Sequence, residues 1–94
     1  MKVTIRGLGH LSNNLGSLVT NIEEDCLNVA ELIRRLMNVF PQLREYLEIT
    51  DSYIDVKPGF LVFVNRIDIR VLLMNESEIC NEAFIDIIPV IHHG

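Results

Sequence analysis

The hydrophobic pattern at the start of the chain has the period of a β-strand. Val3 and Ile5 alternate with polar residues over Met1–Arg6, which predicts a half-buried strand. After glycine- and asparagine-containing turn segments, an apolar pattern resumes over Leu15–Ile22. The two runs together predict an antiparallel hairpin.

A helical pattern follows over residues 29–40. Apolar residues recur there at spacings of three and four, and polar residues occupy the other side. Asn28 is placed to cap this helix, with Glu31 three residues later as in a capping box. Pro41 removes a backbone donor and clashes with the preceding turn, so we expect the helix to end there. The apolar spacing continues over 43–47 and predicts a further turn or two.

The second half of the chain predicts three more strands. Phe60–Val64 is a continuous apolar run that suits a strand buried on both faces. A tight turn at 65–66 lets Ile67–Leu73 return as another strand. Asn75–Glu82 is polar and is expected to be irregular, and Phe84–Ile91 is the last strand.

This order of elements favours an α+β, β-grasp fold. A lone amphipathic helix can bury its stripe only against one face of a sheet. We therefore predict a mixed sheet of four to five strands with one principal helix on one face, and with the first and last strands paired in parallel. A ferredoxin-like fold is the alternative, but it needs a second long helix. The expected core consists of Val3, Ile5, Ile33, Leu36, Met37, Phe40, Leu61, Phe63, Ile85 and Ile87.

Composition and charge narrow the classes of function. Ninety-four residues predict one domain, and 49% hydrophobic residues are enough for a core. The formal net charge of −5 and the lack of a basic run argue against nucleic-acid binding and against anionic membrane surfaces. No signal-peptide pattern or apolar stretch of about 20 residues is present, so a cytosolic, and therefore cytoplasmic, protein is expected.

The two cysteines, Cys26 and Cys80, form no CxxC pair. We expect both to be buried thiols rather than a disulfide or a zinc site, with Cys80 as an inward anchor. His92 and His93 are adjacent, but two ligands are too few for zinc, so no metal site is predicted. There is no phosphate-cradling loop, which implies no cofactor and no ATP site of the protein's own.

The candidate functional segment is the end of the chain. After Pro89, the five residues Val90–Gly94 span at most roughly 17 Å if extended, and such a tail can reach into a partner's pocket. The plainer interpretation is a frayed terminus. Ile88 and Val90 are candidates for the open sheet face, where grouped apolar residues would form a docking patch.

Four segments resemble the sulfur-carrier branch of ubiquitin-like proteins: the opening MKVTIRG, the helix LNVAELIRRL, the run VFVN before a turn, and the closing NEAFIDIIPVIHHG. That branch includes the MoaD-type small subunit of molybdopterin synthase, the thiamine-pathway sulfur carrier and the ubiquitin-related modifier. The resemblance implies one ubiquitin-like domain over 1–94, with 90–94 as an extended tail. In the family the tail ends in two glycines, whereas this chain has His93 before Gly94.

The resemblance also implies the chemistry. An ATP-dependent ubiquitin-activating-type enzyme would adenylate the carboxylate of Gly94, and sulfur would then replace oxygen to give a thiocarboxylate. Pro89, Val90, Ile91, His92 and His93 would enter the partner. The chain would act as a sulfur-donating subunit rather than as a stand-alone enzyme, with the large subunit of molybdopterin synthase as its expected host. The alternatives are a protein modifier or tRNA-thiolation carrier joined through Gly94, and an inert β-grasp interaction module.

Overall fold

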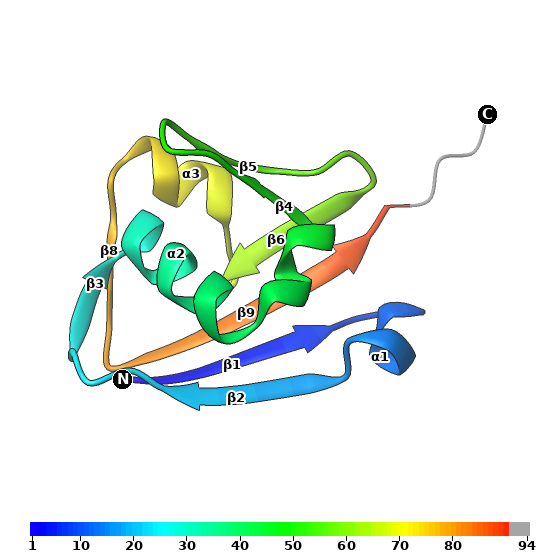
Figure 1. Cartoon of the computed structure of the whole chain (residues 1–94), viewed down its shortest axis with the longest axis horizontal. Coiled ribbons are helices and arrows are strands. Elements are labelled where there is room, and N and C mark those ends of the chain that lie inside the picture. Colours follow the sequence, from blue (N-terminus) through cyan, green and yellow to red (C-terminus); the bar gives the residue numbers. More distant parts are fainter. Residues whose placement is uncertain (91–94) are drawn as a thin grey trace.

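The computed structural model of the chain describes residues 1–90 (Figure 1). Its elements, in chain order, are β1 (Lys2–Gly7), α1 (Leu11–Asn14), β2 (Ser17–Asn21), β3 (Cys26–Asn28), α2 (Val29–Val39), the 3-10 helix η1 (Pro41–Glu45), β4 (Leu47–Ile49), β5 (Ile54–Val56), β6 (Phe60–Val64), β7 (Ile67–Asp68), α3 (Ile69–Met74), β8 (Glu78–Cys80) and β9 (Glu82–Pro89).

The first and last strands pair in parallel at the centre of the sheet. β1 lies beside β9 from Lys2 opposite Glu82 to Gly7 opposite Ile87. β2 and β6 pair antiparallel with the outer sides of β1 and β9, which gives the five-stranded order β2-β1-β9-β6-β7. Two separate ribbons, β3-β8 and β4-β5, complete the strands of the described residues. The predicted α+β fold, with a mixed sheet and adjacent end strands, is confirmed.

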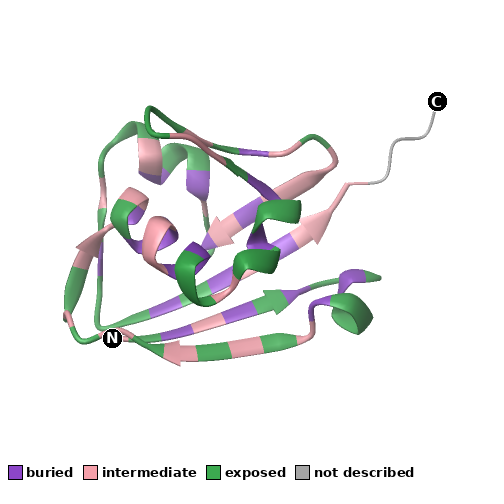
Figure 2. Ribbon diagram, in the orientation of Figure 1, coloured by how far each residue is buried: buried purple, intermediate pink, exposed green. Residues whose placement is uncertain are grey.

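The principal helix, α2, crosses one face of this sheet (Figure 1). The side-chain oxygen of Asn28 accepts a hydrogen bond from the Ala30 N–H at 2.9 Å, so the predicted cap is present. Glu31 does not complete a capping box but pairs with Arg35 one turn later at 3.1 Å. The buried side of α2 consists of Val29, Leu32, Ile33, Leu36 and Met37 (Figure 2).

The predicted core is wrong in strand β6. Leu61 and Phe63 are only half-buried, and the inward side chains are Val62 and Val64, at 1% and 0% exposed. A run of five apolar residues has no alternation, so its phase relative to the sheet cannot be read from the pattern. Phe40 is also half-buried: it lies one residue beyond the end of α2 and packs against the outside of the core.

Three segments differ from their predicted secondary structure. Only Ile67–Asp68 of the expected strand over Ile67–Leu73 is extended, because the Asp68 side chain accepts a hydrogen bond from the Arg70 N–H and caps α3. Leu47 begins β4 instead of continuing a helix. The segment expected to be irregular contains β8, which pairs with β3.

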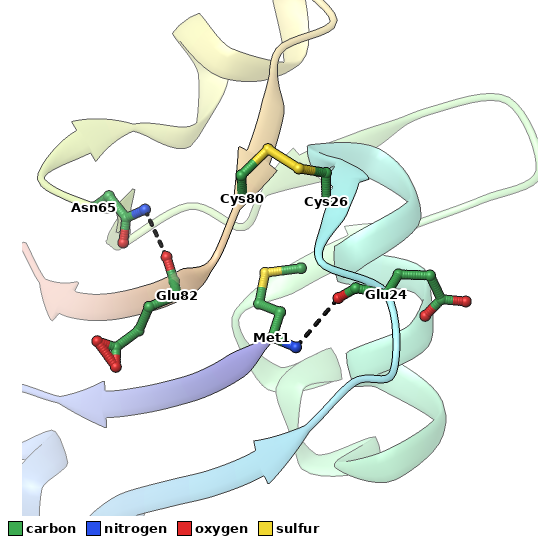
Figure 3. Close-up of a disulfide and its surroundings, with 6 residues drawn as sticks. All are labelled: Met1, Glu24, Cys26, Asn65, Cys80 and Glu82. Carbon is green, nitrogen blue, oxygen red and sulfur yellow. Dashed lines mark hydrogen bonds between the residues drawn. A yellow bond between two sulfur atoms is a disulfide. The ribbon is translucent and has the colours of Figure 1, made fainter.

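The expectation of two buried thiols is wrong. Cys26 and Cys80 lie opposite each other in the β3-β8 ribbon and form a disulfide with a 2.09 Å S–S bond (Figure 3). Both residues are exposed. The inward anchor of β8 is the neighbouring Ile79, at 6% exposed, because successive side chains of a strand point to opposite faces.

Candidate functional site

β9 ends directly before the predicted tail, 90–94. Pro89 ends this strand opposite Phe60 of β6. The next residue, Val90, is half-buried and donates its backbone N–H to the Gly59 carbonyl at 2.8 Å. Gly9 approaches Pro89 so closely that a Cβ on Gly9 would lie 3.4 Å from the Pro89 Cγ. The fold therefore holds the chain in place through Val90, the first residue of the predicted tail.

The remaining tail residues, Ile91, His92, His93 and Gly94, lie outside the described residues. Their predicted insertion into a partner, and the predicted reaction at Gly94, stay predictions. Of the residues predicted to enter the partner, the structure places Pro89 at the end of β9 and Val90 directly after it.

Apolar side chains gather on the sheet face that α2 leaves uncovered. Ala83, Ile85 and Ile87 of β9 point into the core, so the alternate side chains face away from α2. Ile88 lies on this open face and is half-buried, opposite Leu61 in the register of β6 and β9. We name the open-face patch by its four residues, Leu61, Phe63, Phe84 and Ile88. Phe84 is its most accessible member, at 42% exposed.

The sequence predicted only part of this patch. Ile88 was expected on the open face, but its predicted companion Val90 follows the strand and is held by Gly59. Leu61 and Phe63 were missed because they were assigned to the core. A signal for Phe84 was present, since it alternates with the buried residues of the last strand. The docking role of all these residues stays a prediction.

A charged pair crosses the open face beside the patch. Arg6 of β1 lies opposite Asp86 of β9, and its Nε and Nη2 atoms donate to the two carboxylate oxygens at 2.9 and 3.2 Å. This hydrogen bond to Asp86 raises the pKa of the Arg6 guanidinium above its ordinary value. The Asp86 side chain, 14% exposed, is thereby compensated for its partial burial among apolar neighbours.

A hollow of about 520 Å³ lies at one end of the patch. Its lining residues are Arg6, Asn65, Arg66, Glu82, Phe84 and Asp86. Two guanidinium groups and two carboxylates thus surround the exposed ring of Phe84. A hollow of mixed charge around an aromatic ring suits a protein surface better than a single small anion or cation.

Asn65 fixes the position of Phe84. Its Nδ2 donates to the Glu82 carbonyl at 3.1 Å (Figure 3), and its Oδ1 accepts from the Phe84 N–H at 2.7 Å. Asn65 and Arg66 have positive φ values of 50° and 70°, which confirms the predicted tight turn between β6 and β7. The sequence indicated the turn but not this side-chain clamp.

Metal-ligating side chains do not gather in the described part of the chain. Within 1–90, no group of three or more His, Cys, Asp or Glu residues could hold a metal ion. His10 is the histidine of this part of the chain, and it is exposed. No helix among these residues is long and apolar enough to span a bilayer. The geometry presents an apolar open face that continues along β9 as far as Val90.

Comparison with solved structures supports the same fold. The small archaeal modifier protein 1 of Methanosarcina acetivorans is 19% identical, with a TM-score of 0.61 and coverage of 99% of this chain and 96% of that one. Urm1 of Sulfolobus solfataricus is 21% identical, with a TM-score of 0.56 and coverage of 93% and 99%. A putative molybdopterin converting factor, subunit 1, of Pyrococcus furiosus is 15% identical, with a TM-score of 0.58 and coverage of 97% and 99%.

The family assignment comes from the sequence itself. No curated protein matches the chain. Residues 4–94, however, match the sequence model of the family Urm1 (Ubiquitin related modifier), which covers nearly the whole chain and extends through the predicted tail. The chain therefore belongs to the Urm1 (Ubiquitin related modifier) family and is a ubiquitin-like sulfur carrier or modifier.

Proposed function

We propose that the chain is a sulfur carrier activated at Gly94. The observation that carries this proposal is the family match through residue 94, on a fold whose central strand leads directly to the tail. The Gly94 carboxylate attacks the α-phosphate of ATP, and pyrophosphate leaves. Sulfide then attacks the acyl carbon of the adenylate, AMP leaves, and the product is a thiocarboxylate.

An ATP-dependent ubiquitin-activating-type enzyme is the proposed first partner, because residues 1–90 contain no phosphate-cradling loop. The open-face patch supports this choice. Its apolar side chains and the adjacent Arg6–Asp86 pair give an apolar centre with a polar rim, which is the composition of a protein–protein interface. Docking through the patch would hold the enzyme beside the strand from which the tail departs.

Two destinations of the activated carboxylate remain as proposals. In the first, the thiocarboxylate delivers sulfur within molybdopterin synthase, where the tail would enter the large subunit. In the second, the activated Gly94 is joined to a lysine amine of a target protein or serves tRNA thiolation. The description of the matched family as a ubiquitin related modifier favours the second destination. Both begin with the same adenylate.

The proposal is tested by intact-mass spectrometry after incubation with ATP and the activating enzyme of the same cell. We expect an adenylate and, on addition of inorganic sulfide, a species heavier than the acid by the difference between one sulfur and one oxygen atom. Deletion of Gly94 should abolish both products while the far-UV circular dichroism stays unchanged. His93→Gly reports the shape of the channel through which the tail would enter the activating enzyme. Glycine has no side chain and can therefore pass a channel that is too narrow for an imidazole.

The docking role is tested separately from the chemistry. Phe84→Ala should raise the KM of the activating enzyme for this protein while leaving kcat near the wild-type value. Met74→Ala is the matched control, because Met74 is an apolar residue 82% exposed on α3, away from the open face. Absence of an adenylate on the wild-type protein would contradict activation at Gly94 and leave the inert interaction module as the remaining interpretation.

A further inference from the structure

The two edges of the five-stranded sheet are built differently. β7 is only two residues long and turns directly into α3, so that edge offers few free backbone groups. β2 has five residues, Ser17–Asn21, and pairs without interruption along β1. It contains no charged residue, no proline and no bulge, which are the devices that usually protect an edge strand. Figure 1 shows β2 as the outermost strand of the sheet.

The hydrogen bonds at both ends of β2 identify which of its residues face outward. The Gly7 N–H donates to the Gly16 carbonyl at 3.0 Å, and the Ile22 N–H donates to the Met1 carbonyl at 2.9 Å. In an antiparallel pair, hydrogen-bonded and non-hydrogen-bonded residues alternate. The even-numbered residues of β2 therefore bond to β1. Ser17, Val19 and Asn21 direct their N–H and C=O groups away from the sheet.

This edge is complementary to itself. An antiparallel copy related by a two-fold axis through Val19 would place Val19 against Val19 and Ser17 against Asn21. The two-fold axis makes the Ser17–Asn21 pair occur twice, so there are three pairs in all. Each pair exchanges two hydrogen bonds, which gives about six in total. Val19, 54% exposed in the single chain, would be partly covered by its equivalent on the same face of the sheet.

The distribution of charge also favours an antiparallel copy. The acidic residues Glu23, Glu24 and Asp25 begin two positions after the end of β2. In the antiparallel arrangement, the acidic residues of one copy would lie beside segment 11–16 of the other copy. That segment precedes β2 and contains no charged residue. A parallel arrangement would bring the two acidic segments together and so would be repelled.

We propose that β2 is a self-association edge that joins two copies of this chain into one continuous sheet with five strands from each copy. This inference does not depend on activation at Gly94. A pairing of five residues is much smaller than the interface of a stable dimer, so the association should be weak and dependent on concentration. Each copy carries a net charge of −5, and added salt should therefore strengthen the dimer.

Amide hydrogen exchange on the wild-type protein tests the geometry directly. The N–H groups of Leu18 and Thr20 should be protected at every protein concentration, because they bond to β1. Those of Ser17, Val19 and Asn21 should gain protection as the concentration rises. Exchange of the odd-numbered amides that does not change with concentration, up to the solubility limit, would overturn the proposal. Protection that appears only with an added basic peptide would show that a partner strand, rather than a second copy, occupies the edge.

Sedimentation of a charged variant provides the second test. Val19→Lys places two like charges opposite each other at the two-fold axis, and the dimer should be lost. Ile67→Lys is the matched control, because Ile67 is a β-branched residue, 47% exposed, on the opposite edge strand. This control should dimerise like the wild type. A Val19→Lys variant that is folded and still dimerises, or equal loss in both variants, would overturn the assignment to β2.

Discussion

Arg35 joins its own helix, α2, to the segment after β2 through its guanidinium group. Its Nη1 donates to Glu24 Oε2 at 2.6 Å, and its Nε donates to Glu31 Oε1 at 3.1 Å. The Glu24 backbone carbonyl accepts from the amino group of Met1 at 3.2 Å (Figure 3). One residue of α2 thus ties the segment after β2 to the helix, next to the start of β1.

This contact predicts a pH dependence of stability. The hydrogen bond from Arg35 lowers the pKa of Glu24 below its ordinary value of 4.5, so the folded state binds this proton less readily than the unfolded state. The stabilisation should be fully present above pH 4.5 and be lost as the pH falls through the lower, folded pKa. Urea unfolding at several pH values measures it. Glu24→Gln should show a shallower loss of stability over this acidic range, and an identical loss in both proteins would contradict the assignment.

At the scale of the element, α2 supplies the largest part of the core opposite the sheet. Ile33 and Leu36 are both 0% exposed, whereas Val39 on the outer side is 51% exposed. Leu36→Ala or Ile33→Ala should lower the free energy of unfolding by about 2–5 kcal/mol, through lost burial and a residual cavity. Chemical denaturation measures this change.

Val39→Ala in the same helix is the control, with an expected change within about 0.5 kcal/mol. The comparison separates burial from helix propensity, because all three substitutions replace an apolar residue by alanine in α2. Equal effects at the inner and outer positions would mean that α2 does not pack on the sheet as described.

The same element shows why part of the fold could be predicted. Apolar residues in α2 recur at spacings of three and four and alternate with polar ones. The pattern therefore identifies both the helix and the side of it that is buried. β6 is apolar at every position, so its pattern does not show which residues face the core. Leu61 and Phe63 were therefore assigned to the wrong face. Ile67–Leu73 has the apolar pattern of a strand, but the chain is helical from Ile69 onward. The reason is local, because the Asp68 side chain caps α3.

The candidate site was predictable to a similar extent. The end of β9 and the place of Ile88 on the open face follow from alternation along one strand. The β6 part of the open-face patch, Leu61 and Phe63, depends on how β6 pairs with β9, and a contact between strands has no signature in either segment alone. The disulfide was missed for the same reason, since the register of β3 with β8 brings together residues 54 positions apart.

At the scale of the whole molecule, the disulfide links the segment before α2 to the segment before β9. Closing a loop of this length removes much of the freedom of the unfolded chain, and we expect reduction to lower the free energy of unfolding by about 2–4 kcal/mol. Thermal unfolding with and without a reducing agent measures the effect.

The double variant Cys26→Ser, Cys80→Ser is the control. Its unfolding midpoint should match that of the reduced wild-type protein and should not respond to reducing agent. A wild-type midpoint that is unaffected by reduction would mean that the disulfide contributes nothing to the stability of the fold in solution.

The position of β9 at the centre of the sheet determines when the chain can fold during synthesis. The strands β1, β2 and β6 leave the ribosome before β9, but only β9 joins β1 to β6. Until residues 82–89 emerge, the apolar side of α2 has no complete sheet to cover it. Contacts between such distant segments form slowly, because a long loop must close first. A chain released before residue 82 would therefore lack both the fold and the strand that leads to the tail, so incomplete chains would not present the open-face patch.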